Sequence, residues 1–291
     1  MNISVVIPMY NRERTIESAI RSILEQTVQP MEIIVVDDCS TDKSVKIVRK
    51  IRSENEIVRL LCFKKNRGAQ AARNCGIKAS KGEWILLLDS DDELTSNALE
   101  ILSETARKNP GYDVYYGDYY RREGNKIRYI NCKMKGKYGN YFHSILFSSK
   151  ALFQNSIVRK KALQDIGFLD EAVPAYQEWD THIRLSVNHK YCYIHKPIFI
   201  YNIHDGATIS KDGKRDIRGY KYVVRKNGDL FLREVGIKGI IMYYEGMHFR
   251  CNRWKDYRQY YYLCMTRFFQ FISLHDLMQD KWIKLIGSIW K

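Results

Sequence analysis

The sequence predicts an α/β fold, in which a mostly parallel sheet is flanked by helices and followed by a basic helical C-terminal extension. Two observations predict the sheet. Strand and helix patterns alternate from residue 3 to residue 120, and the strands are unbroken apolar runs such as residues 32–37. Strands that are apolar on both sides belong in a parallel sheet whose two faces are both covered. The apolar fraction of 45% fits a folded globular chain.

The elements of this first part follow one another in order. Strands are expected at residues 3–8, 32–37, 58–63, 84–88 and 113–120, and helices at 12–26, 40–51, 69–80 and 96–107. The first helix has apolar residues at helical spacing, and Asn11 is its expected cap.

The alternation loosens after residue 120. A strand and a short helix are expected within 156–171, a helix at 177–189, one or two strands within 191–204, and amphipathic helices from about residue 216. We therefore expect a domain at 1–215, with halves at 1–120 and 121–215, followed by a helical region at 216–291.

Charge and cysteine content narrow the class of protein. The net charge is +15, and residues 206–291 carry 17 Lys and Arg against 8 Asp and Glu, so an anionic partner is one explanation of this basic region. The seven Cys are widely spaced, with no C-x-x-C pair, which favours reduced thiols over a zinc site or disulfides. Because we find no signal peptide and no apolar stretch long enough to span a bilayer, we expect a cytoplasmic protein.

Polar clusters follow four of the expected strands, namely "PMYNRE", "DDCSTD", "KKNRGAQ" and "DSDDEL". Ligands of open parallel sheets bind beyond the carboxyl ends of the strands. The four clusters therefore predict one binding site at one rim of the sheet.

The last cluster places Asp89, Ser90, Asp91 and Asp92 directly after a buried strand. Carboxylate oxygens are the ligands that Mg²⁺ and Mn²⁺ prefer, and these ions often bridge protein carboxylates to phosphates. A solvated turn in which an Asp caps the next helix is the alternative. The apolar strand and the three other polar loops favour the metal site.

Each of the other clusters, taken alone, is weaker evidence for a binding site. Asp37 and Asp38 stand at a strand end, where they could accept hydrogen bonds from a base or a ribose, or belong to a helix cap. Gly68 precedes a helix that carries Arg73, and such a helix start favours phosphate, although a tight turn would look the same. The P-loop and G-x-G-x-x-G patterns are both absent.

Taken together, these segments and "YQEWDTHIRL" resemble the inverting nucleotide-sugar glycosyltransferases of family 2, which have the GT-A fold. The resemblance covers roughly residues 1–205. It implies a UDP-sugar donor, and Mn²⁺ or Mg²⁺ at Asp89 and Asp91, with Asp91 preferred as the direct ligand. It also implies nucleoside contacts from Pro8, Tyr10, Asn11, Asp38 and the turn from Asn66 to Gly68.

The resemblance also locates the catalytic base. The family's base falls on Glu178, where Asp is commoner, and the preceding acid of the family's pair is Gln177 here. Asp180 is the other candidate, unless it is a helix-surface acid paired with Arg184. Trp179 could contact the acceptor or belong to the core, and His204 could complete the metal site or be structural.

The implied reaction needs one carboxylate on the acceptor side and a cation for the leaving UDP, whereas a glycosidase needs two carboxylates. We expect a role in surface polysaccharide synthesis, such as capsule, lipopolysaccharide, exopolysaccharide or teichoic acid, with a glycan or lipid-linked glycan as acceptor. The alternatives are a nucleotidyltransferase and an inactive nucleotide-sugar or glycan-binding scaffold.

The basic, aromatic C-terminal region has several interpretations. It could rest on the anionic inner face of the cell membrane, join subunits of a homo-oligomer, or pack its aromatic rings on the main domain. We do not expect a nucleic-acid partner.

Overall fold

The computed structural model describes residues 1–137, 139–203 and 212–274. The chain forms two compact units. The first unit comprises Met1–Glu171 and Thr181–Asp205, and the second comprises Ala172–Asp180 and Gly206–Lys291. The short segment before Thr181, which contains the candidate base, thus groups with the C-terminal helices.

The first unit follows the predicted order of elements. Its strands are β1 (Ile3–Met9), β2 (Glu32–Asp37), β3 (Val58–Cys62), β4 (Trp84–Leu87), β5 (Glu93–Leu94), β6 (Val114–Glu123), β7 (Lys126–Ile130), β8 (Ser156–Arg159) and β9 (Tyr191–Ile203). Its helices are α1 (Ile16–Leu24), α2 (Ser44–Glu54), α3 (Ala69–Ala79), α4 (Ala98–Lys108), α5 (Phe142–Phe147), α6 (Lys160–Asp165) and α7 (Gln177–Ser186), whose first turn belongs to the second unit.

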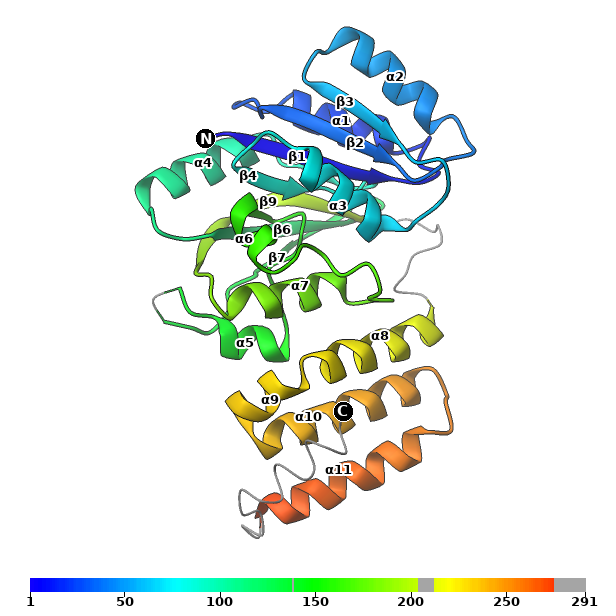
Figure 1. Cartoon of the computed structure of the whole chain (residues 1–291), viewed down its shortest axis with the longest axis vertical. Helices are drawn as coiled ribbons and strands as arrows, with labels where there is room; N and C mark the ends of the chain where they lie inside the picture. The colour runs from blue at the N-terminus through cyan, green and yellow to red at the C-terminus, as the bar shows by residue number, and fades with distance from the viewer. Residues whose placement is uncertain (138, 204–211, 275–291) are drawn as a thin grey trace. The chain divides into compact units, whose positions relative to one another are not determined.

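The strands form one sheet in the order β3-β2-β1-β4-β8-β6-β9-β5, with β7 paired to β6. Strands β1 to β4 are parallel to one another, and so are β6 and β9. Strand β8 runs antiparallel to both β4 and β6, so that it joins the two parallel groups. Figure 1 shows this sheet with helices on its faces, which confirms the predicted α/β class.

Burial of both faces explains the unbroken apolar strands. Val5 and Ile7 of β1 belong to the same core cluster as apolar residues of α1, α2 and α4. Val6, which points to the opposite face, lies under α3, where a Cβ built on Gly76 would come within 2.2 Å of Val6 Cγ1. Every residue of β1 is buried, because each face is covered by helices.

One local expectation needs correction. Asn11 does not cap the first helix, because α1 begins at Ile16 and Asn11 has a left-handed backbone with φ of 51°. Residues 121–145 contain the hairpin strand β7, which the sequence did not indicate. Residues 191–203 form one long strand, β9, which is the first of the two possibilities expected for this segment.

The second unit contains α8 (Gly213–Lys226), α9 (Gly228–Val235), α10 (Ile237–Arg253) and α11 (Gln259–Leu274). The amphipathic helices expected in this region are therefore present. Its interior is aromatic: the Trp179 ring stacks on Tyr220 at 5.6 Å and 15°, and it meets Phe231 edge to face.

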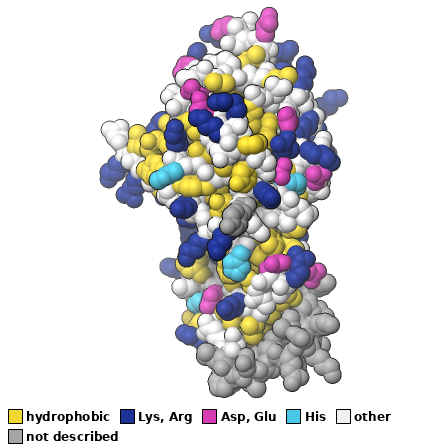
Figure 2. All heavy atoms as spheres, turned by 90° about the vertical axis from the view of Figure 1, so that its left-hand side faces the viewer, with side chains coloured by type: hydrophobic (Ala, Val, Ile, Leu, Met, Phe, Trp, Pro, Cys, Tyr) yellow, Lys and Arg dark blue, Asp and Glu magenta, His cyan; other side chains and the backbone are white. Residues whose placement is uncertain are grey.

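Among the helices of the described residues, none has the length and apolar character needed to cross a lipid bilayer. On the face drawn in Figure 2, Lys and Arg side chains are distributed among hydrophobic and acidic ones.

Candidate functional site

The loop that follows β1 is tied to the loop that follows β2. The Asn11 backbone N–H donates to Ser40 Oγ at 2.9 Å, and Asn11 Oδ1 accepts from the Thr41 backbone N–H at 2.8 Å. Asn11 therefore fixes one loop against the other, and its left-handed backbone is suited to such a turn. Beside it, Pro8 is buried in β1 and Tyr10 is 45% exposed.

The loop that follows β2 also holds the loop that follows β3. Asp38 is 3% exposed, and its carboxylate accepts from the backbone N–H groups of Arg67 at 2.6 Å and Gly68 at 2.8 Å. Asn66 Nδ2 donates to the Asp38 carbonyl at 3.2 Å. Asp37 accepts from the backbone N–H of Ser40. These carboxylates shape the loops, which explains why acids stand at a buried strand end.

Asp89, at the end of β4, is held by two buried donors. Arg73 Nη2 of α3 lies 2.5 Å from Asp89 Oδ1, and Gln154 Nε2 donates to Asp89 Oδ2 at 2.6 Å. Arg73 was expected among the residues that bind the donor nucleotide. The structure places its guanidinium between Asp89 and Gln70, with only 7% of the residue exposed.

Asp91 is held from the loop that follows β1, and Asp92 is held from β9. Arg12 Nε lies 3.5 Å from Asp91 Oδ2, and the backbone N–H of Asn202 donates to Asp92 Oδ1 at 2.9 Å. Asp92 is 1% exposed, and burial, followed by the charge of Asp89, raises the pKa of its carboxyl group well above the usual value. The intervening Ser90 is 5% exposed.

The three aspartates fit a divalent cation. Asp89, Asp91 and Asp92 each offer a ligand atom, and these atoms lie within 4.8 Å of one another. Asp92 Oδ2 is buried and has no hydrogen-bond partner among the described residues. A buried carboxylate oxygen without a donor is costly unless a cation or proton compensates it. The donor set is all oxygen, as Mg²⁺ and Mn²⁺ prefer.

The four polar loops predicted to meet at one rim are thus joined by hydrogen bonds and an ion pair. The sequence did not indicate three residues that hold the aspartates, namely Arg12, Gln154 and Asn202. Asn202 lies 110 residues from Asp92, and no local pattern marks it. The position of Gln154 depends on the pairing of β8 with β4, which the sequence did not reveal.

The candidate base lies in the second unit. Glu178 is half-buried in the first turn of α7. Asp180 is fully buried, and its two carboxylate oxygens lie 2.9 Å and 3.0 Å from Lys226 Nζ. Asp180 is therefore not a surface acid. Trp179 is 8% exposed within the aromatic interior of this unit, and His204 lies outside the described residues.

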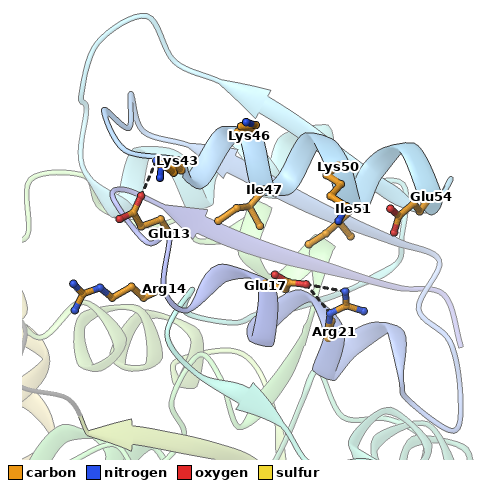
Figure 3. A pocket seen from close by; sticks show the side chains of 10 residues that line it. All are labelled: Glu13, Arg14, Glu17, Arg21, Lys43, Lys46, Ile47, Lys50, Ile51 and Glu54. Atoms are coloured by element: carbon orange, nitrogen blue, oxygen red, sulfur yellow. Dashed lines mark hydrogen bonds and ion pairs between the residues drawn. The ribbon is translucent and has the colours of Figure 1, made fainter.

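A groove of about 500 Å³ lies between α1 and α2, and Glu13, Arg14 and Lys43 of the adjoining loops also line it. Figure 3 shows that charged side chains line it and that several of them are engaged: Glu17 pairs with Arg21, and Glu13 accepts from the backbone N–H of Lys43. It contains none of the predicted site residues, and we do not assign it to the site.

Comparison with known proteins places this geometry in context. The model of the family "Glycosyl transferase family 2" matches residues 4–167. A glucosyltransferase of Campylobacter jejuni, named as a GalNAc(5)-diNAcBac-PP-undecaprenol beta-1,3-glucosyltransferase, is 30% identical over 75% of this chain and 71% of its own length. Glycosyltransferase GlyG of Streptococcus pneumoniae is 39% identical over 44% of this chain, and the match spans 43% of GlyG.

Among solved structures, S. aureus TarS 1-349 in complex with UDP-GlcNAc is similar, with a TM-score of 0.69 and 22% identity. The similarity covers 86% of this chain and 72% of the TarS chain. It shows that the two chains share a fold.

Proposed function

Because this chain belongs to glycosyl transferase family 2 and has the GT-A fold, we propose that it transfers a sugar from a UDP-sugar to an acceptor hydroxyl group, with inversion at the anomeric carbon. The observation that carries the proposal is that four strand-end loops are linked to one another at one rim, where the last of them carries Asp89, Asp91 and Asp92. Such a rim is where open α/β sheets bind their ligands.

In this proposal the donor lies along the rim. The loops of Tyr10, Asp38 and Asn66 receive the nucleoside, and Asp91 would hold Mn²⁺ or Mg²⁺ together with Asp89 and Asp92. When bound, the cation supplies positive charge for the diphosphate of the leaving UDP. The chain contributes a rigid carboxylate set, because Arg12, Arg73 and Asn202 fix the aspartates in advance.

Glu178 acts as the general base. Its carboxylate takes the proton of the acceptor hydroxyl group while the acceptor oxygen forms a bond to the anomeric carbon. The bond between that carbon and the UDP oxygen breaks, and its electron pair leaves with UDP. Burial and the ion pair with Lys226 give Asp180 a structural role instead, which supports Glu178 as the base.

We propose a glycan or lipid-linked glycan as the acceptor and a role in surface polysaccharide synthesis. The name of the Campylobacter relative specifies an acceptor linked to undecaprenol through a diphosphate, which supports this class.

We also propose that the second unit contacts an anionic membrane surface. On α11, Tyr260 is 68% exposed and Phe268 is 54% exposed, with the exposed Arg267 beside them. Aromatic rings at the headgroup level and nearby cations are features of segments that lie on membranes.

The decisive experiment is release of UDP from a panel of UDP-sugars with Mn²⁺, with and without EDTA. We expect slow hydrolysis of one UDP-sugar that stops with EDTA and in the Asp91→Ala variant. Release of pyrophosphate would instead identify a nucleotidyltransferase. Binding of UDP-sugars without turnover, unchanged by Glu178→Gln even when acceptors are supplied, would identify a scaffold.

A further inference from the structure

We propose that Gln154 is a positioning residue of the donor site, which holds the Asp89 carboxylate in the orientation that receives the donor. This inference rests on the proposed function and adds to it a residue that the sequence motifs do not mark.

Asp89 is bound on both of its oxygens. Arg73 donates to Oδ1 and Gln154 to Oδ2, and these two donor residues are 7% and 4% exposed. The Asp89 side chain remains 27% exposed. A carboxylate has about four lone-pair sites, so two remain after these bonds. Asp89 is thus fixed by buried donors, while its remaining lone pairs can bind the cation or accept a hydrogen bond from the donor sugar nucleotide.

The sheet register explains how Gln154 reaches Asp89. Strand β8 runs antiparallel to β4, and their register pairs Trp84 with Arg159 and Leu86 with Ile157. Continued by three residues, the same register sets Asp89 opposite Gln154. Asp89, which begins the D-x-D segment, therefore meets Gln154, which lies two positions before β8, although 65 positions separate them.

The side chain of Gln154 makes no other hydrogen bond among the described residues. Its Oε1 is buried and has no partner there. The amide orientation follows from Asp89, because the reverse one would place oxygen against the carboxylate. A buried acceptor without a partner is unfavourable for folding, so the fold alone does not account for glutamine at this position.

Gln26 shows how a structural glutamine differs. It is 5% exposed, its Nε2 donates to the carbonyls of Ser22 and Thr95, and its Oε1 accepts from the Leu99 backbone N–H. Both ends of Gln26 therefore support the fold, whereas the one hydrogen bond of Gln154 among these residues serves Asp89.

The test compares Gln154→Met with Gln26→Met, both of similar volume to glutamine. Calorimetry with UDP and Mn²⁺ would give the Kd, and thermal melting would give the stability. We expect Gln154→Met to raise the Kd for UDP about tenfold, on the order of one hydrogen bond to a charged group. Gln26→Met should lower the Tm and leave the Kd of the folded protein unchanged.

A second variant, Gln154→Glu, and steady-state kinetics test the role of Gln154 separately from the proposed function. Gln154→Glu preserves the shape but removes the donor, and we expect it to raise the Kd more than Gln154→Met does, because a second carboxylate would face Asp89. KM for the donor should rise while kcat changes little. Wild-type affinity in both variants would overturn the inference, whereas failure of the wild type to bind UDP would overturn the proposed function itself.

Discussion

Glu178 and Asp180 stand two positions apart on one helical turn, yet their side chains have different surroundings. Asp180 is buried against Lys226 and Asn227, whereas Glu178 is half-buried. An ionised acid that is buried and paired is costly to disturb, but it is poorly placed to accept a proton from a substrate. The two carboxylates should therefore respond differently to neutralisation.

We expect Glu178→Gln to keep UDP binding and the Tm but to lose transfer by about 10²–10⁴-fold, the usual contribution of a general base. Asp180→Asn should destabilise the protein by about 1–3 kcal/mol, because Lys226 loses its partner. Calorimetry, melting and single-turnover transfer separate these outcomes. If Asp180→Asn alone abolishes transfer at full stability, Glu178 is not the base.

His182 predicts a pH dependence of stability. It is completely buried, and desolvation lowers its pKa from 6.5 to about 3. The unfolded chain therefore binds a proton more readily, and stability that is complete above pH 6.5 falls by about 1.4 kcal/mol per pH unit as the pH drops towards 3. Urea denaturation at several pH values between 7 and 5 would measure the free energy of unfolding, and that of the His182→Gln variant should fall less with pH than that of the wild type. An equal fall in variant and wild type would show that His182 is not the cause.

At the scale of elements, the close packing of α3 on β1 and β2 positions the site. Gly76 allows this approach, because a Cβ there would lie 2.2 Å from Val6 Cγ1 and 3.3 Å from Val36 Cγ2. Helix α3 also carries Arg73, which holds Asp89, so a shift of the helix would reach the site.

We therefore expect Gly76→Ala to destabilise the protein by about 1–3 kcal/mol through overpacking, although alanine ordinarily favours a helix. The double variant Val6→Ala, Gly76→Ala should recover part of this loss relative to additivity, since the shorter side chain gives the new methyl group room. Urea denaturation of the wild type, the two single variants and the double variant gives the four free energies of unfolding that this double-mutant cycle needs. Strictly additive losses would mean that the two positions do not clash.

At the scale of the whole molecule, the net charge of +15 favours association with anionic surfaces, and the exposed aromatic residues of α11 offer a local contact. Each basic residue near an anionic membrane contributes about 1 kcal/mol, and this contribution weakens with salt. The aromatic contribution is less sensitive to salt, so the two can be separated.

We expect the full chain to sediment with vesicles containing phosphatidylglycerol, and to do so less in high salt. Replacing Tyr260, Arg267 and Phe268 by Ser should reduce this binding, while Ile127→Ser with Arg128→Ser, on exposed positions of β7, should not. Equal binding by both variants would show that general charge, rather than α11, attracts the vesicles.

The sequence by itself determined the α/β class, the order of the elements through β6 except for the short strand β5, and the meeting of four polar loops at one rim. Apolar periodicity reports whether one or both faces of an element are buried, and the carboxyl ends of parallel strands must share an edge. Short motifs were sufficient to indicate the family, because their residues lie close together along the chain.

Only the tertiary structure decided which side chains complete the site. Gln154 and Asn202 reach the aspartates through the pairing of β8 with β4 and of β9 with β5 and β6, and such long-range pairings leave no local pattern. It also placed Asp180 and Trp179 in the interior of the second unit and assigned Arg73 to Asp89. The type of a residue determines which hydrogen bonds its side chain can make. The partner that it contacts is determined by the packing of segments that are distant in sequence.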